Sequence, residues 1–169
     1  MRNKKIRRIV FASLFAAMAS ILKIFSLQIS NNFRISFFPI PIILAGYYLG
    51  PLYGLLVGFI TDTTYIVYSP YASFYSIYTI STLIWGISGY FIKLSKTKIL
   101  MLFVILAITS LIETSINTLA MFVESGDFLT SIANLPNRLI VQFVRLPLIS
   151  ILTYEIISKF TVSELDFSK

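Results

Sequence analysis

The chain has 169 residues, of which 57% are hydrophobic and only 12% are charged, and its net charge is +7. Soluble domains carry about 25% charged residues, so this composition excludes an ordinary soluble domain and indicates a membrane protein. The absence of cysteine and histidine excludes disulfides, thiolate metal sites, thiol nucleophiles and imidazole acid–base chemistry.

The chain begins with a basic segment followed by a long apolar run. Five cations between Arg2 and Arg8 precede apolar residues that continue to about Ile29. A secretory signal peptide has the same order, but its apolar region is only about 7–15 residues long. We therefore expect a retained membrane helix at Ile6–Ile29. Lys23, near its outer end, is expected to snorkel to the membrane surface.

Small residues recur every four positions along this first helix, at Ala12, Ala16 and Ser20, and also at Ser13 and Ala17. Faces of this kind let membrane helices approach closely, because the hydrophobic effect does not drive helices together in lipid. The stripe therefore predicts either packing within the bundle or docking of another membrane subunit.

Six segments approach the roughly 20 apolar residues that a spanning helix needs. They are Ile6–Ile29, Phe37–Leu49, Leu52–Tyr68, Ile77–Ile92, Ile99–Phe122 and Arg138–Ser158. The second is too short to span comfortably unless it is embedded among the others. Gly50-Pro51 separates the second and third, because proline disfavours helical backbone before it and glycine permits a tight turn. We predict an all-α membrane protein with six transmembrane helices in one domain, residues 1–169.

Basic residues predict the orientation of the bundle. Lysines and arginines favour cytoplasmic loops, so the N-terminus and the loop with Lys93, Lys96 and Lys98 should both be cytoplasmic. That requires an odd number of crossings between them, which three separate helices provide. Six helices then place both termini in the cytoplasm and open a substrate cavity to the outside.

Several ionisable or amide side chains fall inside the predicted helices. Arg138 and Arg145 are seven residues apart and share one helix face, Glu113 and Asn117 are one turn apart, and Asp62 lies mid-helix. Such residues usually face a bundle interior or a cavity. They predict either ligand contacts, above all for Arg138, or a structural ion pair between an arginine and one carboxylate. Proton or sodium coupling through the two carboxylates is a further alternative.

Aromatic and cationic residues gather where the outer mouth of a cavity is expected. Arg34 precedes Phe37 at the entrance of the second helix, and Tyr68 and Tyr71 flank a proline-containing loop on the same side. The rings can stack on a flat heterocycle while arginines hold a carboxylate. An interfacial aromatic belt is the alternative. The candidate substrate-binding residues are Arg34, Phe37, Asp62, Tyr68, Tyr71, Asn117 and Arg138.

The chain carries no pattern typical of an enzyme or a motor. It has no glycine-rich phosphate loop with lysine, no cluster of metal ligands and no nucleophile–base pair. We therefore expect no catalytic residues, no metal and no cofactor. Active transport would need either ion coupling through Asp62 and Glu113 or an energised partner. A scaffold membrane protein without ligand is the remaining alternative.

A short six-helix chain with these features and no motor resembles the S components of energy-coupling factor (ECF) vitamin transporters, and the folate type in particular. The resemblance extends from about Arg34 to Tyr154. It is carried by Arg34-Ile35-Ser36-Phe37 leading to Pro41-Ile42, by Ala45-Gly46 with Gly50-Pro51 and Gly54, by Asp62, and by Asn117-Thr118-Leu119 with Leu135-Pro136-Asn137-Arg138-Leu139-Ile140 and Leu146-Pro147. The chain departs from the folate-type pattern at Phe38, where glycine is usual, at Ala120, where tryptophan is common, and at Arg145, which is more often apolar.

The resemblance implies a multi-pass protein of a bacterial cell membrane that captures a folate-like vitamin from outside. It implies docking of the first helix, through Ala12, Ala16 and Ser20, onto a membrane scaffold subunit driven by two cytoplasmic ATPases. An S component for another vitamin and a self-sufficient ion-coupled carrier are the alternatives.

Overall fold

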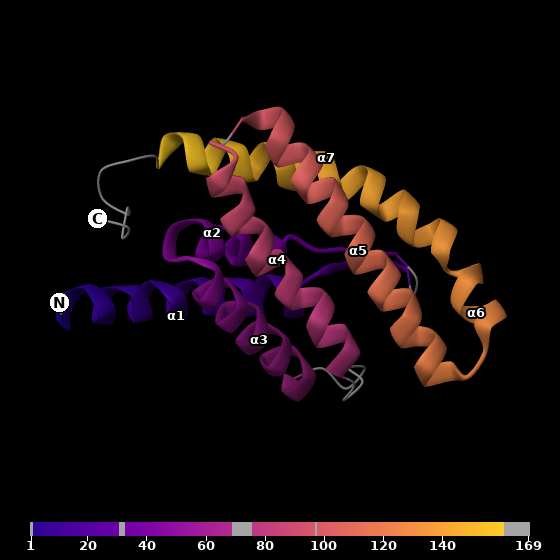
Figure 1. The fold of residues 1–169 in the computed structure, drawn as a ribbon. Helices are drawn as coiled ribbons and strands as arrows, with labels where there is room; N and C mark the ends of the chain where they lie inside the picture. The colour runs from indigo at the N-terminus through magenta and orange to yellow at the C-terminus, as the bar shows by residue number, and fades with distance from the viewer. Residues whose placement is uncertain (1, 31–32, 69–75, 97, 161–169) are drawn as a thin grey trace.

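The computed structural model describes residues 2–30, 33–68, 76–96 and 98–160 and is drawn in Figure 1. Its helices and strands, in chain order, are α1 (Arg2–Ile24), β1 (Leu27–Ser30), β2 (Phe33–Ile35), α2 (Pro39–Leu49), α3 (Pro51–Tyr68), α4 (Ser76–Leu94), α5 (Ile99–Ser125), α6 (Phe128–Ala133) and α7 (Leu135–Lys159). The six predicted helices correspond to α1, α2, α3, α4, α5 and α7.

The predicted break between the second and third helices is confirmed. Gly50 ends α2 with φ of 102°, a left-handed backbone that glycine adopts without strain, and Pro51 begins α3. Three segments, Ile77–Leu94, Ile99–Ser125 and Ser131–Lys159, are long and apolar enough to cross a membrane. By contrast, α2 has 11 residues and is almost entirely buried among its neighbours, as its short length required.

The largest difference from the predicted helices lies between α1 and α2. The first helix ends at Ile24, five residues before the expected Ile29, and the chain enters an antiparallel hairpin in which Gln28 lies opposite Arg34. The hairpin is an addition to the expected all-α fold. Its strand β2 packs against α7, at the opposite end of the chain.

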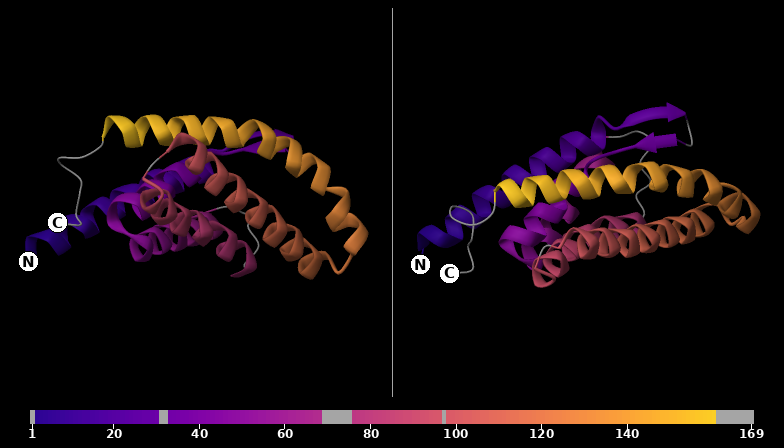
Figure 2. Two further views of the ribbon diagram at one scale, coloured as in Figure 1. Left: turned by 45° about the horizontal axis from the view of Figure 1, so that its top comes forward. Right: turned by 90° about the horizontal axis from the view of Figure 1, so that it is seen from above.

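The helix ends and connections that the structure describes include two groups, one at each end of the bundle (Figures 1 and 2). The start of α1, the α2–α3 turn, the α4–α5 connection and the end of α7 lie together, and we call this the basic end. The hairpin and α6 lie at the opposite end, the hairpin end. The cations of the basic end are Arg2, Lys4, Lys5, Arg7, Arg8, Lys93, Lys96, Lys98 and Lys159.

Glycines allow the backbones of α2, α3 and α4 to touch. A Cβ atom added at Gly86 would lie 2.3 Å from the carbonyl carbon of Gly54, and one added at Gly46 would lie 1.9 Å from the oxygen of Gly86. At Gly89 the added atom would lie 2.0 Å from the oxygen of Ile43. Backbone atoms cannot rotate away as side chains do. These three helices therefore form the closely packed unit against which α1 and α5 lie.

Replacing Gly86 by alanine tests this contact. Overpacking a core costs about 1–3 kcal/mol, and here the clash is with backbone, so we expect a loss of about 3 kcal/mol of unfolding free energy or failure to fold. Gly58→Ala is the matched control, because its Cβ would come no closer than 3.2 Å to any neighbouring atom, the nearest being the Thr82 oxygen. Thermal unfolding in detergent should separate the two variants, and equal stability would contradict the packing.

Candidate functional site

Among the described residues, two separate clusters of polar side chains in the bundle interior contain a buried ion pair. One joins α1, α3 and α4 through Lys23 and Asp62. The other lies between α5 and α7 and contains Glu113 and Arg145. Ionisable groups are costly inside a membrane domain unless each is paired and hydrogen-bonded. The two clusters meet this requirement to different degrees.

In the first cluster, the Lys23 ammonium and both carboxylate oxygens of Asp62 have hydrogen-bond partners within the protein. The Lys23 ammonium donates to Asp62 Oδ1 and, over 3.0 Å, to Thr82 Oγ1. The other carboxylate oxygen, Oδ2, accepts from Thr79 Oγ1 at 2.5 Å. The ammonium also lies 4.8 Å from the centroid of the Phe38 ring, within the range of cation–π attraction. This cluster ties α1 to α3 and α4.

The expectation that Lys23 snorkels to the membrane surface is therefore wrong. The residue is only 8% exposed, because its side chain turns towards α3 and α4 and contacts Asp62 and Thr82 there. This face of α1 lies against α3 and α4, where the ammonium pairs with Asp62.

The second cluster, which we call the α5–α7 seam, consists of Glu113, Asn117, Arg138, Gln142 and Arg145. Arg145 donates through Nη2 to Glu113 Oε2, and Gln142 Nε2 donates to the same oxygen over 3.0 Å. Of the two alternatives left open for Arg145, the structure shows an ion pair with Glu113. That pair is buried, with Arg145 only 6% exposed.

Helical spacing explains why these side chains meet. Arg138, Gln142 and Arg145 stand at positions i, i+4 and i+7 on α7, and Glu113 and Asn117 stand at i and i+4 on α5. Residues at these spacings share one helix face. Since α5 and α7 pack against each other, the two polar faces lie together.

The seam retains hydrogen-bonding capacity that the protein does not use. Among the described side chains, four of its buried atoms lack a protein partner: Asn117 Oδ1, Arg138 Nη1, Gln142 Oε1 and Arg145 Nε. The indole nitrogen of Trp85, whose ring centroid lies 5.5 Å from Arg145 Cζ, is also without a partner. Buried polar groups are normally paired with protein or water, because leaving them bare is unfavourable. The seam can therefore bind a solute that offers both acceptors and donors.

Two of the sequence-predicted substrate residues, Asn117 and Arg138, lie in the seam. Arg138 also contacts the sulfur of Met121 through Nη2. Asp62 does not join them, since it belongs to the first cluster and both of its carboxylate oxygens are engaged there. A substrate contact at Asp62 would require disruption of a buried ion pair.

The residues predicted at the mouth of the cavity have different environments. Phe37 is half-buried and packs against the hydrophobic core. Tyr68 is 67% exposed at the end of α3. The backbone of Arg34 lies in β2 opposite Gln28, and Tyr71 lies outside the described residues.

Sequence reasoning missed Gln142 and did not pair Lys23 with Asp62. The signal for Gln142 was present, because it completes the polar spacing between Arg138 and Arg145. No sequence signal indicated the partner of Lys23, which lies 39 residues away from it along the chain.

The stripe of small residues on α1 is largely turned into the bundle. Ala16 is 4% exposed and Ser20 is 7% exposed, and Ala12 is half-buried against the core. Ser13 and Ala17 lie about 100° further around the helix and are exposed. The structure therefore shows packing within the bundle for Ala16 and Ser20, and it leaves Ser13 and Ala17 accessible.

Residues 7–157 match the family model described as the substrate-specific component of ECF transporters. Among solved structures, the S component for biotin from an ECF-type ABC transporter has 19% sequence identity and a TM-score of 0.74, over 98% of this chain and 96% of that one. The S component of a bacterial ECF transporter has 15% identity and a TM-score of 0.69, over 94% of this chain and 99% of that one. No curated protein matches the sequence.

We expect Lys23→Met to be strongly destabilising, because it leaves the Asp62 carboxylate buried without its cation. Removing one partner of a buried pair costs about 3–5 kcal/mol. The double variant Lys23→Met with Asp62→Leu removes both charges and should regain most of this loss. Unfolding in detergent, arranged as a double-mutant cycle, measures the coupling.

The matched control is the exposed pair of Lys159 and Glu155, one turn apart at the end of α7. Its Lys159→Met variant should change stability by no more than about 0.5 kcal/mol. A similar loss for the buried and the exposed pair would refute the structural role of Lys23.

Proposed function

This chain belongs to the family of ECF transporter substrate-specific components, and we propose that it captures a folate-like vitamin for import. As a member of that family it is a multi-pass membrane protein and the substrate-binding, non-catalytic part of a transport system. Folate as the substrate, the residues that bind it, and the orientation in the membrane are our proposals.

The α5–α7 seam carries this proposal. Its unpaired donors on Arg138 and Arg145 suit a carboxylate, which arginine binds through charge-assisted hydrogen bonds. Its unpaired acceptors on Asn117 and Gln142 suit the N–H groups of a heterocycle such as a pteridine. Folate offers both, since its glutamate carries two carboxylates and its pteridine carries ring and amino N–H groups.

The hairpin end supplies the proposed mouth of the site. Because β2 packs against α7, the backbone of Arg34 lies beside the helix that carries Arg138. We propose that Arg34 adds a second cation for the vitamin and that Phe37, Tyr68 and Tyr71 provide rings for stacking. The basic end would face the cytoplasm, since cations favour that side of a membrane, and the mouth would then open outward.

Another vitamin with a carboxylate remains the second candidate. The fold is similar to that of a biotin S component, and biotin also pairs a carboxylate with N–H donors. An ion-coupled carrier has less support, because each of the proposed coupling carboxylates, Asp62 and Glu113, is already paired with a cation.

Transport by this chain would depend on partners. We propose that the subunit docks onto a membrane scaffold that is driven by two cytoplasmic ATPases, as the family resemblance implies. Of the predicted docking residues, Ala16 and Ser20 are buried in the bundle. A scaffold helix would therefore meet α1 beside Ala12, over the exposed Ser13 and Ala17.

Titration of the purified protein tests the substrate. We expect tight binding of folate by calorimetry, with a change in the fluorescence of Trp85, the one tryptophan, which lies beside Arg145. Arg138→Ala should weaken binding about 10- to 100-fold, because a hydrogen bond to a charged group contributes about 1.5–3 kcal/mol. Gln142→Ala removes a neutral hydrogen bond of about 0.5–1.5 kcal/mol and should weaken binding about 2- to 10-fold.

Arg7→Ala, at the basic end, is the control and should leave the affinity unchanged. Tight binding of biotin instead of folate would favour the second candidate. Failure of both vitamins to bind below the micromolar range would remove the support for vitamin capture. Uptake by vesicles that contain this chain alone, driven by a proton gradient, would favour the ion-coupled carrier.

A variant of α1 tests docking separately from substrate binding. Ala17→Leu should reduce co-purification with the scaffold and ATPases while vitamin affinity is retained, since it adds bulk to the exposed face. Ser115→Leu, on the exposed side of α5, is the size-matched control and should leave assembly intact. If the Ala17→Leu variant assembles normally with the scaffold and ATPases, this face of α1 is excluded as the docking surface.

A further inference from the structure

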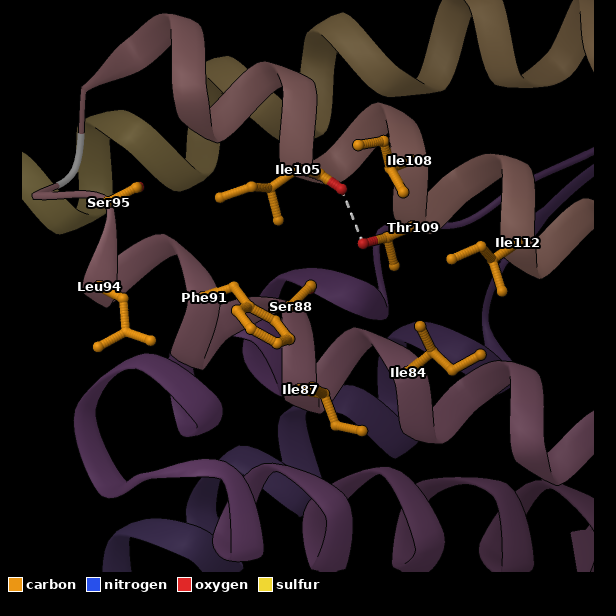
Figure 3. A pocket seen from close by; sticks show the side chains of 10 residues that line it. All are labelled: Ile84, Ile87, Ser88, Phe91, Leu94, Ser95, Ile105, Ile108, Thr109 and Ile112. Carbon is orange, nitrogen blue, oxygen red and sulfur yellow. Dashed lines mark hydrogen bonds between the residues drawn. The ribbon is translucent and has the colours of Figure 1, made fainter.

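An open groove of about 500 Å³ lies between α4 and α5, on the half of these helices nearest the basic end. Its lining residues are Ile84, Ile87, Ser88, Phe91, Leu94, Ser95, Ile105, Ile108, Thr109 and Ile112. Figure 3 shows these side chains on the two facing helices. The groove is distinct from the α5–α7 seam, with which it shares no residue.

The groove offers almost no hydrogen bonds to an occupant. Each of its three hydroxyl groups donates over 2.8 Å to a carbonyl of its own helix: Ser88 to Trp85, Ser95 to Ile92 and Thr109 to Ile105. The remaining lining is aliphatic or aromatic. A solute that must satisfy its own polar groups would lose hydration without compensation there. The fitting occupant is therefore an apolar chain.

Cations stand at the basic end of this groove. Leu94 and Ser95 line it, and the exposed Lys96 and Lys98 follow in the α4–α5 connection. Lys96 has φ of 57°, a left-handed backbone where glycine is the favoured residue after a helix. A cation is thus placed beside the groove at a position where the backbone alone would favour glycine. An apolar chain that ends in an anionic group complements this arrangement.

We propose that the α4–α5 groove binds an anionic phospholipid. One acyl chain lies between the isoleucines, and the headgroup phosphate meets Lys96 and Lys98, near the level where a membrane surface carries its charge. A transmembrane helix suits the groove less well. Helices associate in lipid through small residues, whereas seven of the ten lining residues are isoleucine, leucine or phenylalanine. The glycines Gly86 and Gly89 of α4 are turned towards α2 and α3.

Native mass spectrometry of the purified chain tests the proposal with two probes of identical acyl chains, phosphatidylglycerol and phosphatidylcholine. We expect one phosphatidylglycerol to be retained preferentially. The double variant Lys96→Gly, Lys98→Gln should lower its affinity by about 5-fold for each lysine removed. Lys96→Gly also relieves the left-handed backbone, so a loss of lipid cannot reflect a strained turn. Lys4→Gln with Lys5→Gln removes the same charge from the same end and should have no effect.

A second variant tests the groove itself. Ile108→Trp should fill it and displace the lipid, whereas Leu111→Trp, on the same helix but outside the lining, should not. Equal retention of the two lipids, or no response to the lysine variants, would overturn the headgroup assignment. Retention of lipid by a folded Ile108→Trp protein would overturn the assignment of the groove as the site where the acyl chain binds. Crosslinking in membranes from a photoreactive residue at position 108 to a polypeptide instead of a lipid would show that a protein occupies it.

Discussion

The backbone contact among α2, α3 and α4 is the constraint on which the rest of the bundle depends. Gly46, Gly54 and Gly86 bring peptide groups of the three helices together. In lipid this close approach replaces the hydrophobic effect that drives association in water. It allows an 11-residue helix, α2, to be enclosed by its neighbours. It also turns the glycine face of α4 inward, so that the side of α4 facing α5 carries the larger residues that line the groove.

The two polar clusters outside this glycine contact differ in how completely they are paired. Lys23 and Asp62 satisfy each other with the help of threonine hydroxyls, which leaves their cluster closed and structural. The α5–α7 seam has a central ion pair, but four of its buried polar atoms lack a partner among the described residues. A closed cluster stabilises a helix arrangement, whereas an incompletely satisfied one is available to a ligand. This contrast supports the assignment of substrate binding to the seam.

Particular residues show how far sequence reasoning reached into the site. The polar face of α7 follows from helical spacing, which is local, so Arg138 was identified from its position in the chain, and Gln142 was recognisable on the same ground. The pairing of Lys23 with Asp62 depends on the packing of α3 and α4 against one face of α1. The sequence also did not indicate where α1 ends. Its apolar residues continue past Ile24, so composition alone predicted a longer helix. The hairpin forms instead and packs against α7, a contact between distant parts of the chain that hydropathy cannot indicate.

The sequence by itself determined the membrane class, the six helices, the break at Gly50-Pro51 and the family resemblance. The length of an apolar segment can be read directly from the sequence, and proline and glycine affect only the backbone close to them. Only the tertiary structure decided which polar groups meet. Local rules place a side chain on a helix face, but the neighbour of that face depends on how closely the helices pack and in which order. That is why the stripe of Ala16 and Ser20 was recognisable as a packing surface, while its burial against the bundle was not.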